Sequence, residues 1–235
     1  MDFYRFSISW SRILPTGFVN VINPDGIRYY NELIDELLAN DIEPMVTMYH
    51  WDLPQPLQEI GGWPNRILVD IFTDFAQILY ENFGDRVKNW LTFNEPIQIC
   101  EAGYSSAGKA PAYLSQGVAC YLCSHTLLLA HAKVYRLYDE VYRATQGGKL
   151  TRVPVIARHH RMTISSGRVG IAFDSGWYEP ISDTDEEVVQ TGRQIVVSVF
   201  SCREVKEPSR RTLQITITLC SFLRKLCKVQ DQRLA

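Results

Sequence analysis

An amide and a carboxyl group stand side by side at Asn94 and Glu95, directly before Pro96. Residues 87–93 are predicted to form a short buried strand, which ends here because proline cannot donate to a sheet ladder. A carboxyl group at the C-terminal end of a strand can act as a general acid if apolar or acidic neighbours raise its pKa. The alternative interpretation is an Asn-Glu turn that only caps the next helix, because a short motif is a hypothesis until its context is known.

A second cluster of polar and aromatic groups follows another predicted strand, at residues 43–49. His50 and Trp51 come directly after it. Arg5 lies within a third predicted strand, at residues 3–10, where a charge either extends to the rim of the sheet or faces an acidic site. Because α/β barrels build their active sites at the C-terminal ends of parallel strands, these side chains are candidates for one shared site with the carboxyl group described above.

Helical patterns follow the three predicted strands. Asn23 is a predicted N-cap with Pro24 at the first helical position, and this helix is expected to end near Asn40. A second helix is closed near Gly84, and a long helix covers residues 117–143. The apolar faces include Ile27, Tyr30, Ile34, Leu37 and Leu38 in the first, Ile67, Ile71, Phe75, Ile78 and Leu79 in the second, and Val118, Leu122, Leu129, Ala132 and Tyr135 in the third.

The resulting order is strand, helix, strand, helix, strand, helix. This alternation predicts an α/β fold with parallel strands, right-handed crossovers and a sheet buried on both faces. It excludes an all-α or sandwich fold and leaves open whether the sheet closes into a barrel.

The composition of the 235-residue chain is ordinary for a globular protein, with 46% hydrophobic and 21% charged residues. A net charge of -2 gives no reason to expect a nucleic-acid or anionic-membrane partner. No apolar run approaches the roughly 18 residues needed to span a bilayer, so no membrane partner is predicted. Residues 1–6 lack the basic-then-apolar plan of a signal peptide, and the localisation stays unassigned.

Cys120 and Cys123 form a C-x-x-C pair, which in other settings indicates zinc or redox chemistry. They fall within the long predicted helix, without a second such pair or a histidine at finger spacing, so buried helix cysteines are the better interpretation. His125 and His131 on the same helix are interpreted as packed or capping residues, because no i, i+4 histidine pair or acidic partner accompanies them. We therefore predict no metal site.

Three long motifs identify the family that the chain resembles. They are YRFSISWSRILP at residues 4–15, YHWDLPQ at residues 49–55 and TFNEP at residues 92–96. In this order, with matching helices between them, they resemble family 1 glycoside hydrolases, the retaining β-glucosidases with their lactase and myrosinase relatives. Animal members, particularly those of insects, look nearest.

The resemblance implies a (β/α)₈ barrel that hydrolyses β-linked glycosides with retention at the anomeric carbon, without cofactor or metal. Carried over by motif, Glu95 would be the general acid/base, and Asn94 would hydrogen-bond the sugar 2-hydroxyl. His50 would bind a ring hydroxyl, and Trp51 would add an indole donor or a packing wall. Arg5 would lie beneath the site and hold the catalytic nucleophile as a carboxylate.

The chain differs from the family pattern because the motif with the second catalytic carboxyl group is missing. Retaining hydrolysis needs two carboxyl groups about 5–5.5 Å apart, and the family's nucleophile lies in an Ile/Val-Thr-Glu-Asn-Gly motif that does not occur here. The chain matches only about the second to the fifth of the eight barrel strands, with the fifth in GRVGIAF at residues 167–173. We therefore expect a partial (β/α)₈ TIM barrel that lacks the nucleophile.

The domain prediction follows from where the resemblance extends. Residues 1–193 are expected to form the partial barrel, with residues 150–166 as an irregular insertion before the fifth strand. Residues 194–235 do not resemble the family and are expected to be poorly ordered.

Two interpretations of function remain open. The first is a β-glucosidase-type hydrolase of O-glycosyl bonds, acting in carbohydrate metabolism on a β-linked glycoside. The second is a catalytically inactive sugar-binding fragment or truncated gene product, whose open barrel edges allow self-association. Thioglucosides are less favoured as substrates because plant myrosinases have Gln where this chain keeps Glu95, although insect thioglucosidases also keep the Glu.

Overall fold

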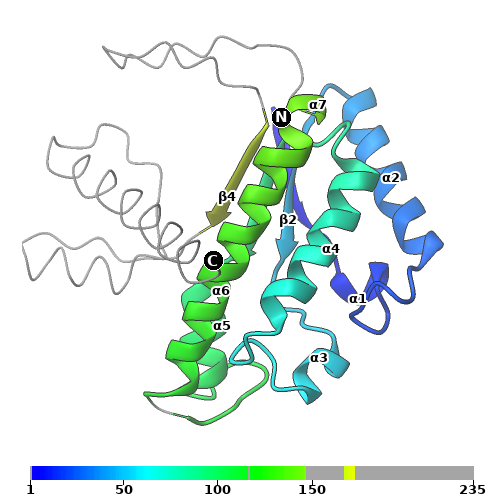
Figure 1. The fold of residues 1–235 in the computed structure, drawn as a ribbon. Helices are drawn as coiled ribbons and strands as arrows, with labels where there is room; N and C mark the ends of the chain where they lie inside the picture. Colours follow the sequence, from blue (N-terminus) through cyan, green and yellow to red (C-terminus); the bar gives the residue numbers. More distant parts are fainter. Residues whose placement is uncertain (1, 116, 147–166, 173–235) are drawn as a thin grey trace, which may run out of the picture. The chain divides into compact units, whose positions relative to one another are not determined.

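Four parallel strands form one sheet in the structure, a computed structural model that describes residues 2–115, 117–146 and 167–172. The strands are β1 (Phe3–Ser7), β2 (Glu43–Tyr49), β3 (Asn89–Asn94) and β4 (Arg168–Ala172), in this order across the sheet (Figure 1). Every neighbouring pair is parallel. The predicted alternation of strands and helices is confirmed, and the predicted fifth barrel strand is β4.

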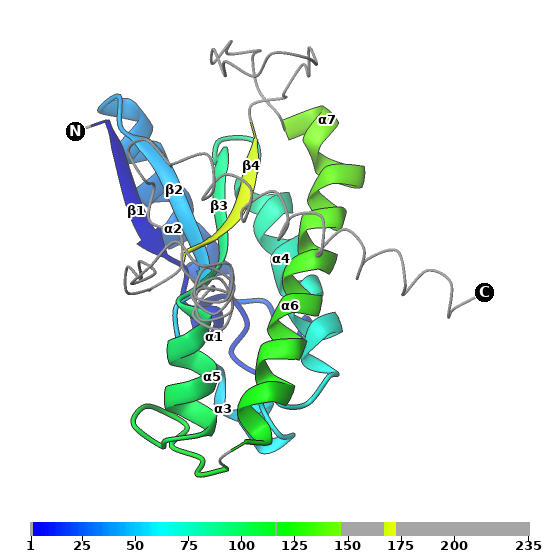
Figure 2. The ribbon, with the colours of Figure 1, turned by 90° about the vertical axis from the view of Figure 1, so that its left-hand side faces the viewer.

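Helices cover one face of this sheet and lie beyond one end of its strands. They are α1 (Trp10–Ile13), α2 (Pro24–Ala39), α3 (Gln55–Glu59), α4 (Leu68–Phe83), α5 (Pro96–Tyr104), α6 (Ala119–Leu137) and α7 (Arg143–Gln146), with a π-helical segment η1 (Tyr138–Tyr142) before α7. Helix α4 contacts both α2 and α6, and the three lie side by side along one face of the sheet (Figures 1 and 2). Helices α1, α3 and α5 lie beyond the carboxyl ends of the strands.

Helix α2 and strand β2 form where the sequence predicts them. The Asn23 side chain accepts a hydrogen bond from the Asp25 backbone N–H at 3.1 Å, and Pro24 takes the first helical position. The helix ends at Ala39, with Asn40 as its C-cap. Strand β2 occupies residues 43–49, with its last four residues buried. Strand β2 pairs in parallel with β1 on one side and with β3 on the other.

Strand β1 is shorter than the predicted strand at residues 3–10. It ends at Ser7, and Trp10 begins α1 instead of continuing the strand. The Trp10 ring stacks on Phe75 of α4, with 4.5 Å between ring centroids and 2° between planes. Burying this indole against α4 outweighs the β-propensity of the local sequence.

The predicted apolar face of the long helix is wrong. Val118 and Leu122 are 60% and 50% exposed, and Tyr135 is 40% exposed. The residues of α6 that are buried are Ala119, Cys120, Cys123, Thr126, Leu127, Ala130 and Val134. Most of these side chains are small, which lets α6 pack closely on α4 and α5, so side-chain volume and not hydrophobicity decides which face turns inward.

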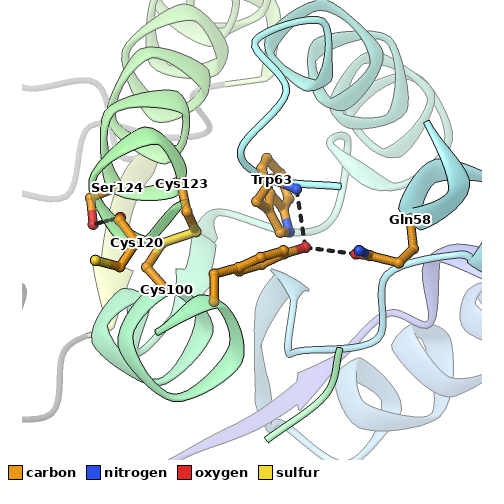
Figure 3. The surroundings of a disulfide bond; sticks show 7 residues. Gln58, Trp63, Cys100, Cys120, Cys123 and Ser124 are labelled. Atoms are coloured by element: carbon orange, nitrogen blue, oxygen red, sulfur yellow. Dashed lines mark hydrogen bonds between the residues drawn. A yellow bond between two sulfur atoms is a disulfide. The ribbon is translucent and has the colours of Figure 1, made fainter. Parts of the chain in front are cut away.

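A disulfide bond between Cys100 and Cys123 joins α5 to α6 (Figure 3). The two Cα atoms are 5.5 Å apart, and 23 positions separate them in the sequence. Cys120 and Cys123 are buried helix residues as predicted, and Cys120 is a free thiol. The pairing of Cys123 with Cys100 was not predicted, because both cysteines of the C-x-x-C pair were interpreted as free cysteines of the core.

Helix α5 is held at its other end by Tyr104. The Tyr104 hydroxyl donates a hydrogen bond to Gln58 Oε1 at 2.7 Å and accepts one from the Trp63 backbone N–H at 3.2 Å. Burial raises the pKa of Tyr104 to about 12, so the hydroxyl keeps its proton at neutral pH. Helix α5 is thus fixed both to α6 and to the segment around α3.

The predictions for residues 150–166 and 194–235 lie outside the described residues. Within the described ranges no helix is long and apolar enough to cross a membrane. The same ranges contain no group of three or more His, Cys, Asp or Glu side chains that could hold a metal ion.

Candidate functional site

Groups from all four strands meet at the pair Asn94 and Glu95. Asn94 is the last residue of β3 and is only 3% exposed. Arg5 reaches it from β1, the segment His50–Trp51 from the end of β2, and Ala172 contacts Glu95 from the end of β4. The structure therefore brings the predicted site residues into one cluster.

The side-chain amide of Asn94 is held on both sides. Its Oδ1 accepts a hydrogen bond from Arg5 Nη2 at 2.5 Å, and its Nδ2 lies 3.1 Å from His50 Nε2. Because a guanidinium can only donate, Oδ1 must face Arg5, and Nδ2 then donates to His50 Nε2. The amide orientation is fixed by this pair of contacts, and the His50 proton is assigned to Nδ1.

Electrostatics agree with a neutral imidazole at His50. Burial lowers the pKa of His50 and the Arg5 charge lowers it further, while Glu95 and Asp52 act in the opposite direction. A neutral ring has the lone pair that Asn94 needs as an acceptor. Burial also lowers the pKa of Arg5, against the attraction of Glu95.

Trp51 uses its indole N–H within the protein. Nε1 donates to the Asn94 backbone carbonyl at 2.8 Å. The backbone of Trp51 has φ = 76°, in the left-handed region that non-glycine residues seldom adopt. The Lys109 ammonium lies 3.9 Å from the centroid of its ring, close enough for a cation–π contact. The predicted indole donor is present, and its acceptor in this structure is the peptide next to Glu95.

Glu95 also has a left-handed backbone, with φ = 47° and ψ = 70°. Its N–H donates to the Ala172 carbonyl at 2.7 Å, and its carbonyl accepts the Gln98 N–H at 2.9 Å. It occupies the N-cap position of α5, but its carboxyl group makes no capping hydrogen bond. The helix-capping alternative therefore explains where Glu95 lies and leaves its half-buried carboxyl group available for chemistry.

Sequence reasoning missed three residues of this cluster. Thr47 accepts a hydrogen bond from Arg5 Nε at 3.0 Å, and a polar residue within a buried strand was a usable signal for it. Burial raises the pKa of Asp52, against hydrogen bonds from the His50 backbone and the Ser9 side chain among others. Lys109 gave no signal, because it belongs to a segment without periodicity.

A cavity of about 330 Å³ lies beside Trp51. It is lined by Tyr49, Trp51, Gln98, Ile99, Lys109 and Ala110. Aromatic rings, an amide and an ammonium suit a ligand that is partly apolar and partly polar. Through Trp51, the cavity adjoins the cluster around Asn94.

The family described as glycosyl hydrolase family 1 matches residues 1–201. The chain belongs to this family. Myrosinase 1 of Brevicoryne brassicae is 56% identical over 151 residues, which are 64% of this chain and 32% of that protein. Human lactase/phlorizin hydrolase is 44% identical over 194 residues, 82% of this chain and 9% of that protein.

Solved structures agree with the family assignment. An aphid myrosinase superimposes with a TM-score of 0.73 at 43% identity, over 84% of this chain and 39% of the other. A rice β-glucosidase gives a TM-score of 0.71 at 39% identity, over 85% and 40%. The family 1 chain thus spans well under half the length of these relatives, and its four strands are part of a (β/α)₈ barrel, as predicted.

Proposed function

We propose that this chain provides the sugar-binding and acid/base part of a retaining β-glucosidase site. The observation that carries the proposal is the convergence of four strands on Asn94 and Glu95, with the Glu95 carboxyl group left free of capping. In this proposal Glu95 is the general acid/base, and Asn94 and His50 bind sugar hydroxyls. Trp51 forms a wall of the sugar site, and Arg5 orients Asn94 through its hydrogen bond to Oδ1.

The proposed reaction assigns two tasks to Glu95. As a carboxylic acid it gives its proton to the glycosidic oxygen while the bond from that oxygen to the anomeric carbon breaks. A second carboxylate attacks the anomeric carbon and forms a glycosyl ester. Glu95, now a carboxylate, takes a proton from the water that displaces this ester, which restores both groups.

The second carboxylate is proposed to lie outside this 235-residue sequence, because the Ile/Val-Thr-Glu-Asn-Gly motif does not occur in it. A mutant of the rice relative has been solved in a covalent complex with glucose, which supports a glycosyl ester in the family. The chain alone is therefore expected to bind sugar without turning it over.

Open edges of the sheet support association with a further polypeptide or a second copy. Among the described strands, β1 and β4 each pair with one neighbour only. Phe3 and Tyr4 on β1 are 54% and 43% exposed. Unpaired edges with apolar side chains favour strand addition, so we propose that the chain self-associates through them.

A second candidate function is thioglucoside hydrolysis, favoured by the 56% identity with Myrosinase 1. The carboxyl group of Glu95 favours O-glycosides as substrates, because an alkoxide is a poor leaving group and needs a proton donor more than a thiolate does. Titration of the chain with matched O- and S-glucosides separates the two. A preference above about tenfold for the thioglucoside would favour the second candidate.

The test of the main proposal is hydrolysis of a nitrophenyl β-glucoside by the purified chain, with Glu95→Gln in parallel. Titration with deoxynojirimycin, which a Thermotoga maritima relative binds, and sedimentation of the same sample report sugar binding and self-association. We expect folded protein that binds the inhibitor and shows no turnover. Turnover that disappears in Glu95→Gln would mean that a second carboxylate is supplied from within the sample, contrary to the proposal. Folded protein without inhibitor binding would contradict the sugar site itself.

A further inference from the structure

The peptide group that links Asn94 to Glu95 is held from two neighbouring strands at once. On one side its carbonyl oxygen accepts the indole N–H of Trp51 at 2.8 Å. On the other side its N–H donates to the Ala172 carbonyl at 2.7 Å. Trp51 follows β2 and Ala172 ends β4, so the plane of this peptide is fixed between both neighbours of β3.

The residue after this peptide has a backbone conformation that needs support. Glu95 is in the left-handed region at φ = 47°, which costs a non-glycine residue roughly 1 kcal/mol or more. Such conformations persist only where surrounding contacts determine them. The two hydrogen bonds to the preceding peptide are contacts of this kind, because they set the plane from which φ of Glu95 is measured.

The Trp51 indole is well suited to hold the peptide in place. It is half-buried, it packs edge-on against His50 at 5.2 Å, and the Lys109 ammonium covers its face. The acceptor, the Asn94 carbonyl, belongs to a residue with only 3% exposure, so water cannot easily replace the indole N–H. Loss of the hydrogen bond from the Trp51 N–H to the Asn94 carbonyl should therefore have a measurable effect on this peptide.

We propose that Trp51 is a positioning residue for Glu95, which acts by clamping the Asn94–Glu95 peptide together with Ala172. This clamp determines the left-handed backbone conformation of Glu95, which carries the proposed catalytic carboxyl group. The importance of the clamp for catalysis rests on the proposed role of Glu95, whereas the clamp itself does not. The inference also reassigns the Trp51 N–H from the sugar to the backbone of the acid.

The test replaces Trp51 by Phe in the full 235-residue chain, which keeps an aromatic ring and removes the N–H. Selective ¹⁵N-glutamate labelling gives the exchange rate of the Glu95 amide proton, and the ¹³Cα shift of Glu95 reports its backbone conformation. Trp90→Phe is the matched control. Trp90 lies on β3, the strand that ends at Asn94, and is 1% exposed. Its indole nitrogen has no hydrogen-bond partner among the described residues.

Trp51→Phe is expected to raise Glu95 amide exchange about tenfold and to move its ¹³Cα shift, as the loss of one hydrogen bond to a buried acceptor predicts. Trp90→Phe should leave the Glu95 shift in place. Unchanged Glu95 signals in Trp51→Phe, or equal changes in both variants, would overturn the proposal.

Titration with deoxynojirimycin separates this inference from the proposed function. Weaker inhibitor binding by Trp51→Phe with an unchanged Glu95 amide would show that the N–H serves the sugar, and the clamp would be rejected. An unmodified chain that binds no inhibitor, but shows the expected change at Glu95, would reject the sugar site and keep the clamp.

Discussion

Phe93 and Asn94 are consecutive on β3, yet they belong to regions held together in opposite ways. Phe93 is fully buried and stacks on Phe72 with 4.6 Å between centroids, with Trp63 edge-on at 5.2 Å. Asn94 makes three directed hydrogen bonds, one each through Oδ1, Nδ2 and its backbone carbonyl oxygen. Alternation along a strand places the two side chains on opposite faces of the sheet. Phe93 is held by contacts with several rings at once, whereas each polar atom of the Asn94 side chain depends on one hydrogen bond.

This comparison predicts that changes in the ring cluster affect stability far more than changes at the site. Trp10 is fully buried and touches four other rings, so Trp10→Ala should lower the free energy of unfolding by about 3–5 kcal/mol. Denaturant unfolding measures the loss, and Trp10→Phe, which keeps a ring, is the control. A loss below about 1 kcal/mol would show that the cluster does not carry the fold.

His131 sharpens the comparison, because it places a titratable group within the packed region. Thr92 donates to the Gly170 carbonyl at 3.2 Å and lies 2.9 Å from His131 Nδ1, which ties α6 to β3. Burial lowers the pKa of His131 to about 4, below the ordinary value of 6.5. Between these two values the unfolded chain binds a proton that the folded chain does not.

Stability should therefore fall as the pH is lowered from about 6.5 to about 4, by about 3 kcal/mol from this group, with no further loss from it below that. Unfolding free energies across this range measure the slope. His131→Gln, which keeps an amide donor, should flatten it. An identical slope in the variant would assign the pH dependence to other groups.

Asn94→Ala is the smallest expected change in stability and tests the site side of the comparison. Removing the amide leaves Arg5 and His50, which are only partly buried, free to bind water, so the loss should be about 1 kcal/mol. Deoxynojirimycin binding should weaken about tenfold, as loss of a direct hydrogen bond to a sugar hydroxyl predicts. Asn94→Asp keeps an acceptor for Arg5 and should retain the stability. If Asn94→Ala lowered the free energy of unfolding as much as Trp10→Ala does, the two regions would not be separable.

Much of the fold was predictable because local signals and packing agree. The cap at Asn23, Pro24 at the start of α2 and the buried run of β2 each have a local physical cause, and their boundaries were predicted closely. The face of α6 was not, because hydrophobicity favoured large residues such as Leu122 while close packing selected Ala and Cys. Helix α5, at Pro96–Tyr104, was not among the helices predicted from the apolar pattern.

Only part of the candidate site was predictable, because the motifs indicated five of its residues and missed Thr47, Asp52 and Lys109. The contacts between the side chains were not predictable. Motif order placed Arg5, His50 and Glu95 at strand positions that the parallel sheet brings together. A sequence does not show that the Trp51 N–H reaches the Asn94 carbonyl, or that Thr47 holds Arg5, because both contacts depend on register between strands. The Cys100–Cys123 bond depends in the same way on how two helices pack.

The left-handed backbone at Glu95 has a consequence for how this chain can change over generations. Glycine and asparagine adopt that conformation at lower cost than glutamate, so either would relax the turn while removing the carboxyl group. Stability alone therefore favours substitutions that remove the carboxyl group at this position. A lineage that keeps Glu95 gives up this gain in stability, as is expected where a residue is retained for its function.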